Sequence, residues 1–172
     1  MGKFAGTQDG QPRPVSTDRV LERLRYLCSR REYCTSDIRS KALAALGGRE
    51  EEAEEIVRSL IADRYVDDLR YASAYARDKA ALAGWGAAKI RYALAAKKID
   101  RETISAALDA IDDAKAADRL KKLAESKYRS LVSGRNPVSG YELRQKLLRF
   151  AVSRGYSFEQ AESAISALVS GE

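Results

Sequence analysis

Apolar residues recur along most of this chain with the spacing of amphipathic α-helices. Ala53, Ile56, Val57, Leu60 and Ile61, for example, follow the i, i+3, i+4, i+7, i+8 series, which places all five on one side of a helix. Similar series predict nine helices between positions 16 and 168, and no segment alternates for long enough to predict a β-strand. The predicted fold class is therefore all-α.

Polar residues mark where several of these helices begin. Asp67 stands where its carboxylate would cap a helix, and Ser157 with Gln160 has the spacing of a capping box. Leu69 and Phe158 follow these caps and fit the apolar series, so we expect both side chains to face the core.

One apolar pattern is repeated along the chain. In two segments it steps by +4, +9, +14 and +18 from its first residue, and in a third it gains about four residues at Gly47-Gly48. The three sets are Ile90, Leu94, Ile99, Ile104 and Leu108; Leu147, Ala151, Tyr156, Ala161 and Ile165; and Ile38, Ala42, Leu46, Ile56 and Leu60. Each predicts a helix, a turn and a second helix; the alternative is a chance match of amphipathic helix pairs.

A further helix before each pair completes a module of three. We expect a disordered arm at 1–15, helix-turn-helix-like modules at 16–66, 67–112 and 113–172, and a flexible, protease-sensitive loop at 133–140 inside the third. Helix-turn-helix outlines can read DNA, but the closing helix of the first module begins with the Glu50–Glu55 cluster. Carboxylates would repel phosphates there, which argues against a recognition helix.

The sequence lacks the residues and motifs on which most enzymes depend. Histidine is absent, and there is no phosphate-binding glycine loop, dinucleotide fingerprint or nucleophile elbow. Cys28 and Cys34 lack metal-site spacing and are expected to be small semi-buried apolar residues. We expect no catalytic residue, no metal and no cofactor; a carboxylate-based enzyme is the class left open.

The apolar runs of the chain are too short to form a membrane-spanning helix. Met1–Pro14 has no hydrophobic stretch typical of a secretion signal, and no run approaches the ~20 residues of a membrane span. We expect a cytoplasmic protein that does not contact membranes.

Charge is segregated along the chain. The 31 basic and 25 acidic residues leave a net charge of +6. Positions 50–68 hold eight acidic and two basic residues, whereas positions 115–156 hold eleven basic and three acidic ones. The basic stretch predicts an anion-binding surface, with a solvated face as the alternative. Its candidate binding residues, with two more from the middle of the chain, are Lys115, Arg119, Lys122, Arg129, Arg144, Lys146, Arg149, Arg154, Lys89 and Arg91.

Four segments resemble, in the same order, those of the RecX family of RecA regulators. They are Arg30–Lys41, Arg64–Ala72, Gly84–Leu94 and Arg154–Ser157, and the resemblance covers about 20–168. Two positions depart from the family pattern: Ala87 replaces a frequent proline, and Lys98 replaces the glycine of a Lys-Gly-Ile turn.

The resemblance implies an extended, curved arrangement of the three modules and a role without catalysis. Proteins of this family lie in the groove of the RecA–DNA filament and restrain its recombinase, ATPase and coprotease activities in DNA repair, recombination and the SOS response. The implied partners are the RecA filament and single- and double-stranded DNA, bound mostly without sequence specificity by a monomer. The alternative is a general DNA- or RNA-binding helical protein, whose salt-dependent affinity for DNA would be independent of RecA.

Overall fold

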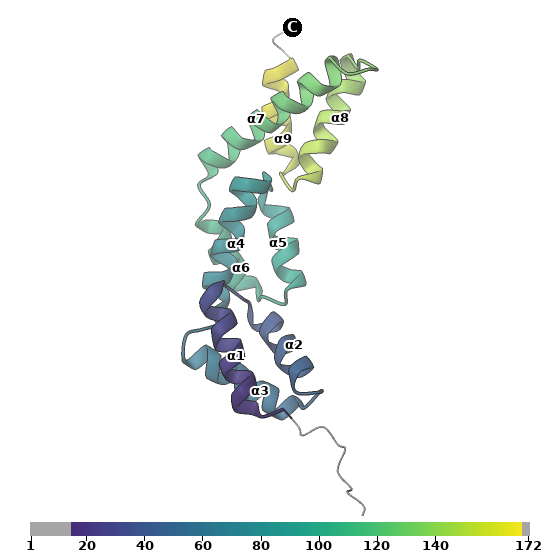
Figure 1. The fold of residues 1–172 in the computed structure, drawn as a ribbon. Helices are drawn as coiled ribbons and strands as arrows, with labels where there is room; N and C mark the ends of the chain where they lie inside the picture. Colours follow the sequence, from purple (N-terminus) through teal and green to yellow (C-terminus); the bar gives the residue numbers. More distant parts are fainter. Residues whose placement is uncertain (1–14, 170–172) are drawn as a thin grey trace, which may run out of the picture.

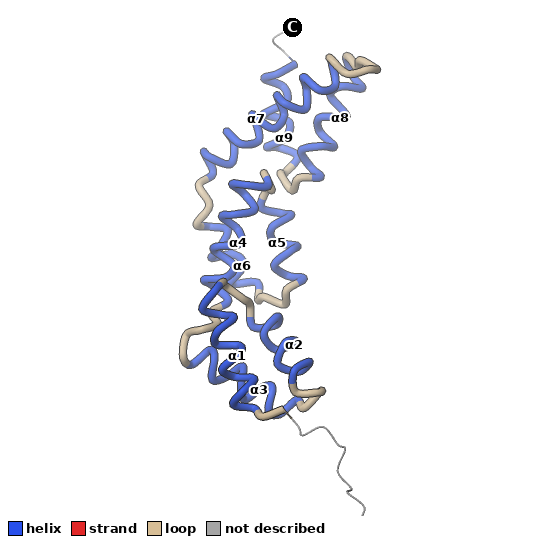
Figure 2. The backbone as a smooth tube through the Cα atoms, in the orientation of Figure 1, coloured by secondary structure: helices blue, strands red, loops and turns tan. Residues whose placement is uncertain are grey.

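The computed structural model describes residues 15–169, and within them the chain is helical without a β-strand (Figures 1 and 2). The helices are α1 (Thr17–Arg30), α2 (Thr35–Ala45), α3 (Glu50–Ala62), α4 (Asp68–Ala83), α5 (Ala87–Ala96), α6 (Arg101–Asp109), α7 (Asp113–Val132), α8 (Gly140–Ser153) and α9 (Phe158–Val169). The predicted all-α fold class is confirmed. The expected disordered arm falls almost wholly outside the described residues.

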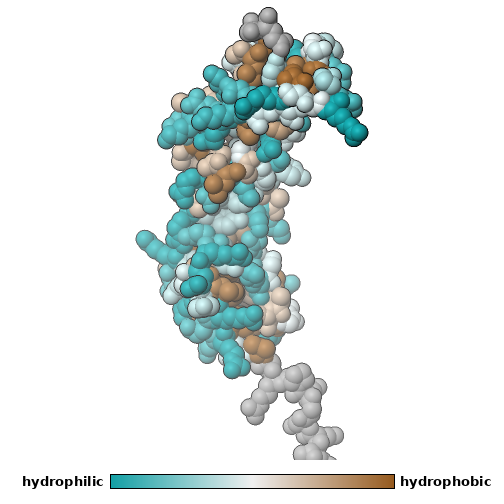
Figure 3. Space-filling model, turned by 45° about the horizontal axis from the view of Figure 1, so that its top comes forward, coloured by the Kyte–Doolittle hydropathy of each residue, from teal (hydrophilic) through white to brown (hydrophobic). Residues whose placement is uncertain are grey.

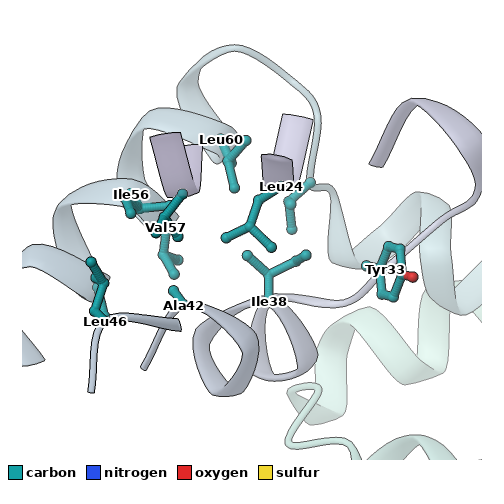
Figure 4. Packing of buried hydrophobic residues seen from close by; sticks show 11 residues of the cluster. Leu24, Tyr33, Ile38, Ala42, Leu46, Ile56, Val57 and Leu60 are labelled. Atoms are coloured by element: carbon teal, nitrogen blue, oxygen red, sulfur yellow. The ribbon is translucent and has the colours of Figure 1, made fainter. Parts of the chain in front are cut away.

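Three hydrophobic clusters follow one another along the chain. The first is built from α1–α3, the second from α4–α6 and the third from α7–α9. All fifteen residues of the repeated apolar pattern lie in these clusters, each no more than 8% exposed. Figure 4 shows the first cluster, where Ile38 and Ala42 of α2 point toward Ile56, Val57 and Leu60 of α3. The repeat therefore marks three equivalent three-helix cores.

The modules are arranged end to end in an extended, gently curved row (Figure 1). The helices α2, α5 and α8, one from each module, line the same edge of the row. Most helix packing is internal to a module, such as that of α4 on α6 and of α8 on α9. The predicted tandem, extended and curved arrangement is confirmed.

The caps predicted at Asp67 and at Ser157 with Gln160 are present. Asp67 Oδ1 accepts a 2.9 Å hydrogen bond from the Arg70 amide, at the start of α4. Ser157 and Gln160 make both bonds of the capping box: the Ser157 amide donates to Gln160 Oε1 at 2.9 Å, and the Gln160 amide donates to Ser157 Oγ at 3.1 Å. These side chains satisfy amides that have no partner inside the helix.

Three side chains expected in the core are exposed. Ile61, Leu69 and Phe158 are 45%, 49% and 65% exposed. Each lies within two residues of a helix end. The apolar period gives the side of a helix on which a residue lies but not how far the neighbouring helix extends, so terminal positions can be left uncovered.

The segment between α7 and α8 is a loop, as expected from its glycines and proline. Its Val138 amide donates to the Leu131 carbonyl at 3.1 Å, and the Val138 side chain packs against the third cluster. One end of the loop is thus attached to α7. The flexibility of the loop stays a prediction.

Candidate binding surfaces and module joints

The second and third modules are joined by backbone hydrogen bonds between two helix ends. The Gly86 amide, at the N-terminus of α5, donates to the Arg154 carbonyl at 2.8 Å. The Ala88 amide donates to the Gly155 carbonyl at 3.1 Å. These carbonyls end α8, so the positive end of one helix dipole meets the negative end of another. We call this contact the second joint.

Two glycines make this close approach possible. A Cβ on Gly86 would lie 2.4 Å from the Gly155 carbonyl oxygen. A Cβ on Gly155 would lie 2.4 Å from Lys89 Cβ, and Gly155 also has a left-handed φ of +91°. Both glycines belong to the segments that carry the family resemblance. The joint requires glycine at both positions because there is no room for a Cβ atom.

Two of the predicted binding residues stabilise the second joint. Arg154 Nη1 donates to the Ala83 carbonyl at 2.8 Å, and its guanidinium lies 5.2 Å from the centre of the Phe150 ring. Lys89 Nζ donates to the Ser153 carbonyl at 3.3 Å and lies 4.8 Å from the centre of the Trp85 ring. Both cations are therefore partly engaged within the protein.

The first and second modules meet at the corresponding helix ends, but through side chains. Ser36 Oγ, in the first turn of α2, donates to the Lys97 carbonyl at 2.6 Å, where α5 ends. The Asp37 carboxylate accepts a hydrogen bond from Lys97 Nζ at 2.8 Å and raises the pKa of Lys97. The Thr35 amide donates to Asp68 Oδ1 at 2.7 Å. We call this contact the first joint.

A cysteine contributes to the first joint. Cys34 precedes α2 yet packs in the core of the second module, where it is fully buried. Cys28 is only partly buried, and burial raises the pKa of its thiol. Both cysteines are free.

The candidate residues of α7 differ in exposure. Lys122 and Arg129 are exposed, and neither forms an ion pair with a side chain that the structure describes. Lys115 is exposed and lies 3.4 Å from Asp112. Arg119 is half-buried beside a cavity of about 50 Å³ that Trp85 also lines. Gly86 of the joint lines the same cavity, so Arg119 belongs partly to the joint. Its Nε has no hydrogen-bond partner in the described structure.

Ion pairs engage two candidate residues of α8. Arg144 pairs with Glu162 of α9, and Lys146 Nζ lies 2.8 Å from Glu142 Oε1. Arg149 is exposed, and its Nε donates to the Gln145 carbonyl at 3.3 Å. In the part of the chain that the structure describes, Arg149 has no carboxylate partner, and neither has the exposed Arg91 of α5.

The acidic segment is partly neutralised by neighbouring arginines. Arg49 pairs with Glu52 at 2.6 Å, and Arg39 pairs with Glu54. The pKa of Glu52 is lowered, first by a hydrogen bond from Thr17, and that of Glu54 is lowered by its hydrogen bond from Arg39.

On the face shown in Figure 3, hydrophilic side chains cover most of the surface and hydrophobic patches are small.

The side chains that the structure describes between residues 15 and 169 include no group of three or more His, Cys, Asp and Glu residues that could hold a metal ion. Nor does any helix in this range have the length and apolar character needed to cross a membrane.

Three stacked cores and matching joints define a helical-repeat protein built from three-helix modules. The family model described as "RecX, second three-helix domain" matches residues 67–108, and that described as "RecX, third three-helix domain" matches residues 114–165. The chain belongs to the RecX family.

Curated relatives carry the name "Regulatory protein RecX". The relative from Vibrio parahaemolyticus is 30% identical over 91% of this chain and 96% of its own length. Those from Clostridium tetani and Clostridium perfringens (strain 13 / Type A) are each 32% identical, over 67% and 79% of this chain. The matches span 52% and 62% of these clostridial proteins.

Solved structures have the same fold. One described as "Crystal structure of regulatory protein RecX" has a TM-score of 0.76, with 24% identity over 91% of this chain and 72% of its own. One described as "Crystal structure of RecX from Lactobacillus salivarius" has a TM-score of 0.77, with 22% identity over 88% of this chain and 96% of its own.

Proposed function

We propose that this chain binds the RecA–DNA filament and lowers RecA's recombinase, ATPase and coprotease activities, without catalysing a reaction itself. Membership of a family of regulatory proteins supports a regulatory role. RecA is the target that the resemblance in the sequence implies. The main structural support is the end-to-end stack of modules, because an extended row can contact several neighbouring subunits of a helical filament.

The joints give this row a defined shape. Backbone and side-chain hydrogen bonds fix both joints, so the modules present their surfaces at set positions. Contacts made by separate modules then act together, and their combined affinity can exceed each one by orders of magnitude. A monomer of this kind can restrain a filament in the cytoplasm through occupancy alone.

Cationic residues without carboxylate partners support contact with the DNA of the filament. Of the candidate set, Lys122, Arg129, Arg149 and Arg91 are exposed and lack such a partner within the described residues. Lys115 and Lys146 form surface ion pairs, which contribute little and can exchange for phosphate contacts. Arg119, Arg144, Arg154 and Lys89 have contacts within or between modules and are weaker candidates.

The test is RecA's ATPase activity on single-stranded DNA, and its strand exchange, with increasing amounts of this protein. We expect both activities to fall at or below one protein per RecA subunit. Unchanged activities at molar excess and low salt would refute the proposal. Salt-dependent DNA binding in that case would favour the general nucleic-acid binder, which the unpaired cations also support.

A further inference from the structure

One exposed side of α1 carries a row of arginines. Arg19, Arg23 and Arg30 are exposed, and no carboxylate pairs with them in the range 15–169. Tyr26 lies among them in the helical series and is 64% exposed. The adjoining side of the helix buries Val20 and Leu24, and Arg23 lines a surface pocket together with both. We call these three arginines and Tyr26 the α1 row.

Neighbouring carboxylates are already engaged by another arginine. Arg25 Nη1 lies 2.7 Å from Glu22, and its Nη2 lies 2.7 Å from Asp63 of α3. Asp18, in the first turn of α1, lies where a negative charge stabilises the helix dipole. The remaining arginines of α1 therefore keep their charge available for an external anion.

The spacing of the row suits a nucleic-acid strand. Positions 19, 23, 26 and 30 are three or four residues apart, so they lie along one line of the helix surface. At 1.5 Å per residue, the row extends for about 16 Å, which is about the axial length of five nucleotides of one strand. An exposed aromatic ring between cations is the combination by which proteins hold single strands, since bases stack on the ring while arginines contact phosphates.

The rest of the first module limits where the strand can lie. Glu50, Glu51 and Glu55 of α3 are exposed and would repel phosphates. In the third module the equivalent helix is α7, which carries the exposed Lys122 and Arg129. In the middle module α4 has Arg77 and Asp78 adjacent, 4.0 Å apart. Exposed cations without a carboxylate partner thus lie on the first helices of both end modules, in addition to Arg91 of α5 and Arg149 of α8.

We propose that the α1 row binds single-stranded nucleic acid, with Arg19, Arg23 and Arg30 on the backbone and Tyr26 stacked on a base. The α1 row lies before both regions matched by the family models. The proposal rests on the proposed function only in taking the filament's DNA as the strand that is bound. It adds a second contact with DNA, made by the first module at the end of the molecule opposite α7.

Direct binding to a fluorescent oligodeoxythymidylate, followed by anisotropy over a salt series without RecA, tests this proposal. Arg19→Ala, Arg23→Ala and Arg30→Ala together should weaken binding at least about tenfold at low salt and reduce the slope of log affinity against log salt by about two. The matched control is Arg58→Ala, Arg77→Ala and Arg101→Ala, which removes the same charge from exposed positions elsewhere. It should change affinity and slope much less.

Two variants of Tyr26 separate stacking from charge. Tyr26→Ala should weaken binding about tenfold with an unchanged salt slope, whereas Tyr26→Phe should keep wild-type affinity because the ring remains. Equal losses in Tyr26→Ala and Tyr26→Phe would overturn the stacking role. Circular dichroism melting of each variant should match the wild type, since these side chains are exposed.

RecA's ATPase assay distinguishes failure of this proposal from failure of the proposed function. If the Arg19, Arg23 and Arg30 variant keeps full DNA binding but loses its effect on RecA, the α1 row contacts protein and the proposal is overturned. If wild-type protein leaves RecA unaffected while the variant loses DNA binding, the proposed function fails and the α1 contact stands. Full DNA binding with a full effect on RecA would also overturn the α1 proposal.

Discussion

Lys98 and Gly155 occupy equivalent positions at the ends of α5 and α8, and both have a left-handed backbone. Their φ angles are +59° and +91°. Each residue follows the C-terminal cap of its helix, Lys97 in one case and Arg154 in the other. The first joint is made through the side chains of Ser36, Asp37 and Asp68 and does not require the close helix approach of the second, so a Cβ is accommodated at Lys98. Lysine nevertheless adopts this conformation less readily than glycine.

Lys98→Gly should therefore stabilise the protein. Removing Cβ relieves a left-handed strain of about 1–2 kcal/mol, of which the greater freedom of glycine in the unfolded chain offsets part. We expect a net gain of about 0.5–1 kcal/mol in the free energy of unfolding by urea titration. Lys98→Ala, which keeps Cβ but removes the charge, is the control and should give no gain. Equal gains in both variants would show that charge, not backbone strain, is responsible.

Gly155→Ala should be markedly destabilising. The added methyl meets Lys89 Cβ at 2.4 Å, so backbone strain and overpacking together should lower stability by about 2–4 kcal/mol. Gly47→Ala is a matched control, because Gly47 has φ +65° but nothing within 4 Å of a new Cβ. It should lose only about 1 kcal/mol. Small-angle scattering should show a change of shape for Gly155→Ala alone; identical losses and shapes would contradict the steric role.

Joint replacement of Lys122, Arg129 and Arg149 by alanine should weaken DNA binding. Each lacks a carboxylate partner in the described range, so its replacement removes charge without breaking an ion pair. We expect the salt slope for duplex DNA to fall by up to about 2.7, at about 0.9 for each phosphate that the variant no longer neutralises. Arg58, Arg77 and Arg101 serve again as the control set, and the melting temperature should hardly move. A full salt slope would place the DNA-binding surface elsewhere.

Acid should destabilise the fold partly through two capping aspartates. The Thr103 amide lowers the pKa of Asp100 below its ordinary value of 3.8, and the Lys115 amide does the same for Asp112. A depressed folded-state pKa adds stability that is present above pH 3.8 and is lost as the pH falls through the folded-state pKa values. Asn can cap without titrating, so Asp100→Asn with Asp112→Asn should make stability less dependent on pH below about 5. Urea titrations at neutral and acid pH measure this, and parallel profiles for the two proteins would contradict it.

Helix positions could be predicted from the sequence because each helix carries its own local pattern. Every residue of the apolar repeat is buried in the structure, and the Ser157–Gln160 capping box could be predicted from spacing alone. The coverage of helix ends was not predictable: Leu69 and Phe158 have the right period, but no neighbouring helix covers them. Coverage is a tertiary property that no local pattern contains.

The candidate surface was less predictable than the fold, because charge counts do not show which cations are engaged. Arg144 and Glu162 are eighteen residues apart in sequence, and Arg154 reaches Ala83 across a joint. Neither pairing leaves a local signal. The α1 row lies outside the two charge-rich segments at 50–68 and 115–156, and it becomes visible only when the residues of α1 are placed on a helical wheel.

The joints also determine the order in which the molecule can be completed during synthesis. The Ser36 hydroxyl and its acceptor at Lys97 are 61 positions apart, so a module can bury its core before the next helix end exists. The ribosome releases the N-terminal module first. While the third module is being made, the Gly86 and Ala88 amides of α5 have not yet met their acceptors at Arg154 and Gly155. A nascent chain can therefore fold module by module. The last folded module keeps hydrogen-bonding groups without partners at its free helix end until the next module supplies them.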